Sequence, residues 1–216
     1  ALAAAGALSV ADTARLLRIR GKAMQEAVPV GVGAMAALLG LDFATAQTVA
    51  AEAAQGDVCQ AANDNDPSQV VVSGHKAAVE RAVELAKAAG AKRAMLLPVS
   101  APFHCALMAP AADVMAEALV SVEINAPAVP LVANVSAEAL SDPVMIRALL
   151  VEQVTGSVRW RESVLYMGET HGISEIWEIG AGKALSGMVR RINKDIACRN
   201  IGTPEDIAGA LEALNG

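Results

Sequence analysis

The sequence predicts an α/β protein in which a smaller α+β subdomain interrupts a larger one. Short apolar runs alternate with helical patterns over much of the chain, which is typical of strands separated by crossover helices. Between residues 30 and 98 the order becomes β-α-β-β-α-β, the split βαβ arrangement of ferredoxin-like folds. Hydrophobic residues make up 54% of the chain and aromatic residues only 2%, so we expect an interior rich in Ala, Val and Leu.

The first predicted helix begins at Ser9, a capping residue supported by Asp12, and ends before Pro29. The inserted region then alternates apolar runs with helical patterns. The polar cluster NDNDPS turns the chain between its second and third strands, and Gly90 closes its second helix. We expect strands at 32–40, 57–63, 69–74 and 91–99, and helices at 44–55 and 75–89.

Beyond residue 99 the pattern returns to α/β alternation. Asp142 with Pro143 opens one helix, and Thr203 with Pro204 opens the last one. The predicted helices are 105–122, 142–154, 157–172, 183–194 and 203–216, and the predicted strands are 128–135, 174–180 and 195–202. These strands are short and apolar on both faces, so they fit a parallel sheet. The predicted domains are a large α/β subdomain, 1–29 and 99–216, and an insert, 30–98.

Composition argues against several classes of function. A net charge of −6 gives no global basic field, so we expect no nucleic-acid partner. No uncharged apolar run reaches the ~18 residues of a membrane-spanning helix, and we expect no membrane association. The cysteines Cys59, Cys105 and Cys198 are odd in number and widely spaced, which favours reduced thiols in a cytoplasm over disulfides or a zinc site.

Arg20 is the first candidate for a binding residue. At about 100° per residue, it falls in the apolar sector of the first helix with Leu16, Ala23, Met24 and Ala27. A buried guanidinium is costly without an anionic partner. Two interpretations remain open: an internal salt bridge or a head group that reaches water, and a fork that binds a ligand carboxylate or phosphate.

His104 is the candidate for proton transfer. Pro102 disfavours helix in the residue before it, so we expect His104 at or just before the first turn of the next helix. The helix dipole there opposes an imidazolium and favours the neutral form that a general base requires. The alternative is a structural histidine at a helix start. His75 and His171 have weaker claims to chemistry.

Five segments together resemble one enzyme family: RIRGKAMQEAVPVGVGAMAALLG, NDNDPSQVVVSGH, PVSAPFHCALMAPAADVM, VEQVTGSVRWRESV and EIGAGKALSGMVRRI. They are similar to the malonyl-CoA:acyl-carrier-protein transacylases of bacterial fatty-acid synthesis, in the right order and over essentially the whole chain. The resemblance implies an α/β-hydrolase-like large subdomain with a ferredoxin-like insert. It also implies malonyl-CoA as a substrate, acyl carrier protein as a partner and no cofactor.

The resemblance assigns expected roles to individual residues. His104 is the catalytic base, and Arg20 binds the free carboxylate of the malonyl group. Gln153 orients the imidazole through its main-chain carbonyl. Met24 forms pocket wall, and Phe103 narrows the space beside the carbon between the two carbonyls, which disfavours methylmalonyl.

A serine nucleophile of the form Gly-x-Ser-x-Gly is the part that the sequence lacks. None of its serines has glycine at both positions two residues away, so we expect the nucleophile outside these residues and this chain alone to be inactive. Two alternatives remain. One is an acyltransferase domain clipped from a larger fatty-acid or polyketide synthase. The other is a non-catalytic scaffold that docks carrier protein through Arg190, Arg191 and Lys194.

Overall fold

The computed structural model describes residues 1–215 of the chain. It divides into two compact units, Ala1–Trp160 and a second unit that begins at Arg161.

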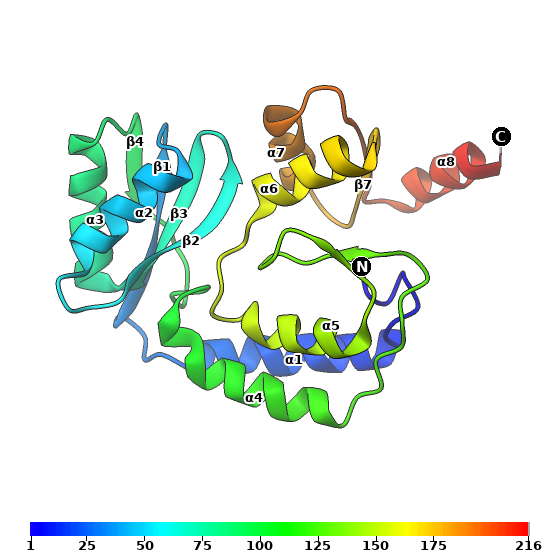
Figure 1. Ribbon diagram of the computed structural model, residues 1–216, viewed down its shortest axis with the longest axis horizontal. Coiled ribbons are helices and arrows are strands. Elements are labelled where there is room, and N and C mark those ends of the chain that lie inside the picture. Colours follow the sequence, from blue (N-terminus) through cyan, green and yellow to red (C-terminus); the bar gives the residue numbers. More distant parts are fainter. Residues whose placement is uncertain (216) are drawn as a thin grey trace. The chain divides into compact units, whose positions relative to one another are not determined.

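A four-stranded antiparallel sheet with two helices on one face forms the first part of the larger unit (Figure 1). Its strand order, β2-β3-β1-β4, confirms the predicted ferredoxin-like arrangement. The elements are β1 (Gly33–Leu39), α2 (Phe43–Ala54), β2 (Cys59–Asp66), β3 (Gln69–His75), α3 (Lys76–Ala88) and β4 (Arg93–Leu96). The expected insert, 30–98, brackets this sheet, and its domain boundaries stay a prediction.

Small apolar side chains fill the space between this sheet and its helices. Leu38 from β1 and Val72 from β3 meet Val79 and Ala82 from α3, and all four are fully buried. The Asp42 side chain caps α2 by accepting a hydrogen bond from the Thr45 main-chain N–H at 2.7 Å. The core therefore has the Ala, Val and Leu character that the composition predicts.

Three helices form the second part of the larger unit: α1 (Val10–Glu26), α4 (Ala109–Val120) and α5 (Pro143–Glu152). Helix α1 packs on α4, and α4 packs on α5 (Figure 1). Ser9 caps α1 as predicted, accepting a hydrogen bond from the Asp12 N–H at 2.9 Å. Leu16, Ala23 and Met24 are buried, so the predicted apolar sector of α1 is correct.

Three predicted features differ from the structure. The turn predicted over NDNDPS is confined to Pro67 and Ser68, because β2 continues to Asp66 and β3 begins at Gln69. The strand predicted at 128–135 is only β5 (Leu131–Val132), which pairs antiparallel with β6 (Ala139–Leu140) and joins no parallel sheet among the described residues. The helix predicted at 157–172 is shorter, because α6 (Trp160–Leu165) changes into a π-helical turn, Tyr166–Thr170. Residues 157–159 instead run beside β2, with the Val158 N–H donating to the Ala62 carbonyl at 2.8 Å.

The second unit has a β-α-β core. Strands β7 (Glu175–Ile179) and β8 (Ala197–Ile201) pair in parallel, with α7 (Ala184–Ile192) between them in the chain, so here the parallel prediction is correct. The last helix, α8 (Pro204–Asn215), begins after Thr203, whose hydroxyl accepts from the Asp206 N–H at 3.2 Å.

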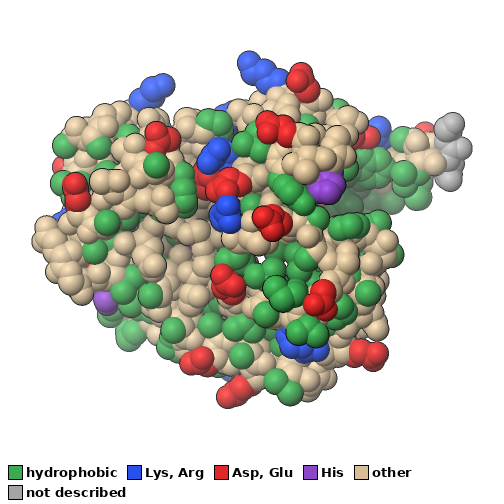
Figure 2. All heavy atoms as spheres, in the orientation of Figure 1, with side chains coloured by type: hydrophobic (Ala, Val, Ile, Leu, Met, Phe, Trp, Pro, Cys, Tyr) green, Lys and Arg blue, Asp and Glu red, His purple; other side chains and the backbone are tan. Residues whose placement is uncertain are grey.

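Charged side chains of both signs stand intermixed among apolar ones on the face that Figure 2 shows. Within residues 1–215, no helix combines the length and the apolar character needed to cross a membrane.

Candidate active site

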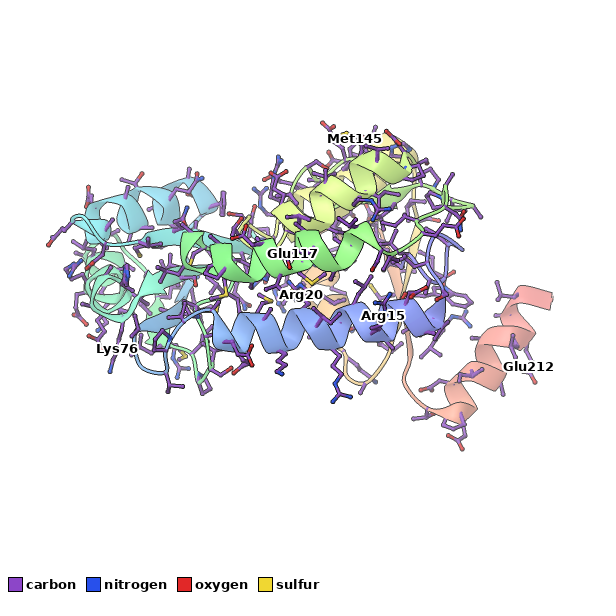
Figure 3. The ribbon with its side chains drawn as sticks, turned by 90° about the horizontal axis from the view of Figure 1, so that it is seen from below. Arg15, Arg20, Lys76, Glu117, Met145 and Glu212 are labelled. Carbon is purple, nitrogen blue, oxygen red and sulfur yellow. The ribbon has the colours of Figure 1, made fainter. Side chains whose placement is uncertain are left out.

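Gln153 joins the two candidate residues of the sequence. The Nη2 of Arg20 donates a hydrogen bond to the Gln153 side-chain Oε1 at 2.7 Å. The Nδ1 of His104 lies 3.1 Å from the Gln153 main-chain oxygen. Arg20 comes from α1, which Figure 3 shows with Arg15 and Arg20 labelled, and Gln153 caps the carboxyl end of α5. The structure therefore brings Arg20, His104 and Gln153 into one cluster.

The end of α5 explains why the Gln153 carbonyl is available. The last carbonyls of a helix have no intrahelical N–H partner, so they accept hydrogen bonds from elsewhere. Because a carbonyl can only accept, Nδ1 of His104 carries the proton in this pair. The neutral imidazole then presents an unprotonated Nε2, the atom that can take up a proton.

His104 lies in a bend two residues before the 3₁₀ turn Ala106–Met108, as its predicted place before a helix requires. Its φ of +58° is in the left-handed region, which is uncommon for a residue with a side chain. The surrounding loop must hold this backbone, and it aims the ring at the end of α5.

Burial is the main cause that lowers the pKa of His104 below its ordinary value, and the nearby Arg20 cation lowers it further. Hydrogen bonds with the main chain of Gln153 and Gly156 oppose this shift without cancelling it. The neutral form is therefore favoured, as expected, but the physical cause is desolvation and a neighbouring charge rather than the helix dipole on which the sequence argument rested.

Arg20 is half-buried, and burial lowers its pKa. Its partner is the neutral amide of Gln153, and among residues 1–215 the structure gives it no carboxylate partner. The internal salt bridge that the sequence left open is therefore not present in the described part of the chain. A guanidinium retains several N–H donors after one hydrogen bond, and these suit a carboxylate or phosphate.

A cavity of about 540 Å³ lies beside this cluster. Arg20, Gln153 and Asn134 are polar residues in its lining, and most of the remainder is apolar. Apolar residues from α1, α4, α5 and the β5–β6 pair contribute to it, among them Leu16, Leu119, Leu131, Leu140, Ile146 and Leu150. The guanidinium thus stands at the edge of a largely apolar space, where electrostatic interactions are stronger than in water.

The other two predicted site residues pack against the apolar core. Met24 is 3% exposed within the apolar core around α1 and α4, and it is not among the described residues that line the cavity. Phe103 is partly buried and packs against that same core and against the smaller cluster of Met35, Ala62 and Val71. Their expected roles in the pocket stay predictions.

Three residues that were not predicted from the sequence support the cluster. The Gln153 Nε2 donates to the Asn134 Oδ1 at 3.4 Å, and the Ala106 N–H donates to the Gln60 Oε1 at 2.7 Å. Gly33 lies against Pro102. Asn134 and Gln60 stand as polar residues within apolar runs, which was the available signal. Gly33 gave no such signal, because a glycine at the boundary between a turn and a strand is common and does not indicate a close contact.

His75 and His171 make contacts of a structural kind. The Nδ1 of His75 accepts a hydrogen bond from the Val58 N–H at 2.9 Å, at the start of α3. The ring of His171 stands edge-on to Tyr166, with ring centroids 4.8 Å apart.

Comparisons with known proteins show the family to which this chain belongs. Residues 1–179 match the family model described as acyl transferase domain. The chain is 49% identical over 212 residues to the malonyl CoA-acyl carrier protein transacylase of Escherichia coli strain K12, covering 98% of this chain and 68% of the relative.

Solved structures of malonyltransferases are also similar to this chain. An acyl-carrier-protein S-malonyltransferase from Bartonella henselae superposes with a TM-score of 0.95 at 56% identity, covering 100% of this chain and 68% of that one. A malonyl-transacylase in complex with a type II PKS acyl-carrier protein superposes with a TM-score of 0.94 at 43% identity, covering 99% and 69%. This chain belongs to the acyl transferase domain family, among its malonyl CoA-acyl carrier protein transacylases.

Proposed function

We propose that this chain serves the transfer of a malonyl group from malonyl-CoA to the phosphopantetheine thiol of acyl carrier protein, through a serine acyl-enzyme. The observation that carries the proposal is the double use of Gln153, whose side chain holds Arg20 while its carbonyl holds His104. Gln153 therefore holds both the cation that would bind the acyl group and the base that would activate the nucleophile.

His104 acts as the general base in this proposal. The unprotonated Nε2 takes the proton of a serine hydroxyl as its oxygen bonds to the thioester carbon of malonyl-CoA. When the carbon–sulfur bond breaks, the imidazolium returns the proton to the CoA sulfur. In the second half, the carrier thiol gives its proton to His104 and its sulfur attacks the carbonyl carbon of the malonyl ester. As the carbon–oxygen bond to the serine breaks, the imidazolium returns the proton to the serine oxygen. The lowered pKa of His104 supports the neutral starting state.

Arg20 binds the free carboxylate of the malonyl group. Its half-buried charge has only a neutral amide as partner among the described residues, so a substrate carboxylate would supply the missing counter-ion. A bidentate pair fixes the acyl group by its charged end. Acyl groups without a second carboxylate would leave the cation unpaired, which disfavours them.

Met24 and Phe103 have supporting roles in the proposal. Phe103 directly precedes the histidine and is held by packing on two clusters, so its ring has little freedom to move aside. A rigid ring there would restrict a branch on the carbon between the carbonyls. Met24, buried one turn beyond Arg20, would support the acyl end of the pocket from beneath.

The nucleophile would come from polypeptide outside these 216 residues, because no serine within them has glycine at both positions two residues away. Without a nucleophile and oxyanion donors, only binding groups and a base remain. We therefore expect the chain alone to transfer no malonyl group.

The partner and the setting follow from the same chemistry. Acyl carrier protein is the acceptor, in line with the relative solved in complex with its acyl-carrier protein. Serine-based acyl transfer uses side chains and needs no cofactor beyond malonyl-CoA as substrate. The cysteines are present as free thiols, which supports a cytoplasmic location.

The two alternative interpretations are less well supported. The relatives described above carry the names of transacylases rather than of larger synthases. A non-catalytic scaffold would not need Gln153 to hold both an arginine without a carboxylate partner among the described residues and a histidine with an unprotonated Nε2.

The test uses an extended chain, by which we mean these residues preceded by the nucleophile-bearing segment of the Escherichia coli relative. Malonyl transfer to carrier protein, followed by intact mass, is expected for the extended chain and absent for the chain alone. His104→Ala in the extended chain is expected to abolish transfer without preventing carrier binding. If the chain alone binds carrier protein and the extended chain never loads it, the scaffold alternative is correct.

A further inference from the structure

The loop that carries His104 depends on contacts with the four-stranded sheet. Its left-handed backbone at His104 is unfavourable by itself, so surrounding groups must hold it. Ala101, Pro102 and Cys105 are buried, and the Cys105 thiol donates to the Pro102 carbonyl at 3.2 Å. The Ala106 N–H is fixed by Gln60 of β2.

Pro102 meets the sheet at Gly33, the first residue of β1. A Cβ added to Gly33 would lie 2.6 Å from the Pro102 Cδ, 2.8 Å from its Cβ and closer still to its Cγ. Real Cβ atoms essentially never approach other heavy atoms within 3.0 Å. The space that a side chain would occupy at position 33 is therefore taken by the proline ring.

The ring has little room to yield. Pro102 is buried, and its pyrrolidine is closed on its own backbone, so it has no rotamer that turns away. Moving the ring means moving the main chain of residues 101–105, which also carries His104. Gly33 has no positive φ, so its missing side chain answers the approach of Pro102 and not a backbone requirement.

We infer that Gly33 is a positioning residue for His104: by lacking a side chain it lets Pro102 seat on β1, and this seating sets the ring where its Nδ1–H reaches the Gln153 carbonyl. The importance of this for catalysis rests on the role proposed for His104. The positioning itself is testable in the chain without catalysis.

The test reads the tautomer of His104 by ¹⁵N NMR in the full 216-residue chain above the imidazole pKa. The parent chain is expected to show only the Nδ1–H form, because the Gln153 carbonyl accepts that proton. Gly33→Ala is expected to give a mixture in which the Nε2–H form appears. Pro102→Gly in the same molecule removes the Cβ, Cγ and Cδ atoms that the new methyl group would meet. The double variant is therefore expected to recover most of the Nδ1–H form.

Two control variants separate positioning from general damage. Val79→Ala opens a cavity in the same subdomain, away from the loop, and Gly209→Ala in α8 meets no atom within 4 Å. Both are expected to keep the single tautomer, although Val79→Ala lowers stability.

A single Nδ1–H tautomer in folded Gly33→Ala would overturn the inference, as would an equal mixture in Val79→Ala. If Gly33→Ala fails to fold, the double variant must fold again. A double variant that stays unfolded shows that Pro102 is not the reason for the glycine. Failure of these results leaves the proposed transfer reaction intact, and failure of the reaction leaves the tautomer result intact.

Discussion

Gln153 links a cation and a base through two different atoms of one residue. The amide orientation is set by its partners, since Oε1 accepts from Arg20 and Nε2 donates to Asn134. Through this arrangement the charge of Arg20 is held near the imidazole and lowers the pKa of His104. The same residue that prepares acyl binding therefore also favours the neutral base.

Replacing Arg20 tests this electrostatic link. Arg20→Gln removes a cation that disfavours the imidazolium, so the pKa of His104 is expected to rise. An NMR titration of the His104 ring measures it. Arg18→Gln on the exposed face of the same helix is the matched control and is expected to move this pKa less. Equal shifts in both variants would contradict the link.

Protonation of His104 is expected to destabilise the fold. Its pKa in the folded state lies below the unfolded value of about 6.5, so the neutral ring favours folding above that value. As pH falls below about 6.5, the unfolded state binds the proton first and stability is lost until pH passes the folded pKa.

Urea unfolding at several pH values between about 7.5 and 5 measures this loss against His104→Gln. The variant is expected to lose less stability over that interval than the parent chain. His171→Gln, an exposed control, is expected to follow the parent. Parallel pH dependence of the parent and the His104→Gln variant would contradict this expectation, because it would show that the pKa of His104 is the same in the folded and the unfolded state.

At the scale of elements, the features that depend on neighbouring residues were predicted correctly from the sequence. Ser9 and Thr203 cap their helices, and the β-α-β-β-α-β order gave the right sheet, because capping and alternation depend on neighbouring residues. The strand predicted around Leu131 was wrong in its length and its pairing. Its apolar run resembles a buried parallel strand, but Leu131 pairs antiparallel with Leu140, which follows after a short turn. Pairing partners cannot be read from the periodicity of one segment.

Glu178 organises the start of α7 in the second unit. Its carboxylate accepts from the Leu185 N–H at 3.0 Å, the Ser186 N–H at 2.8 Å and the Ser186 hydroxyl at 2.6 Å, and Asn200 adds a fourth donor at 3.1 Å. Desolvation raises the pKa of Glu178, but these hydrogen bonds outweigh it, so the pKa lies below its ordinary value. The carboxylate thus satisfies main-chain donors that the first turn of a helix leaves free.

Glu178→Gln replaces one accepting oxygen with a donor and leaves part of this turn unsatisfied. Amide hydrogen exchange of Leu185 and Ser186 is expected to become about tenfold faster. Glu175→Gln, which removes only an exposed ion pair with Arg199, is the control and is expected to leave these amides unchanged. Unchanged exchange in Glu178→Gln would mean that the turn is held by other contacts.

At the scale of the whole chain, the site joins segments that the sequence holds far apart. Arg20 and Gln153 are 133 residues apart, and His104 and Gln153 are 49 apart. The residue types and the buried sector of α1 could be predicted from pattern, and the meeting of these residues followed from resemblance to a family. The supports at Gly33, Gln60 and Asn134 could not, since each depends on a close approach that only the folded chain creates.

The most direct test asks whether replacing Arg20 slows the loading of malonyl and acetyl groups to different extents. Acyl-enzyme formation from malonyl-CoA and from acetyl-CoA is measured by intact mass in the extended chain, with Arg20 and with Arg20→Ala. Loss of a charge-assisted pair is expected to slow malonyl loading by about ten- to a hundredfold, while acetyl loading stays equal or rises. An equal loss for both acyl groups would contradict the claim that Arg20 receives the malonyl carboxylate.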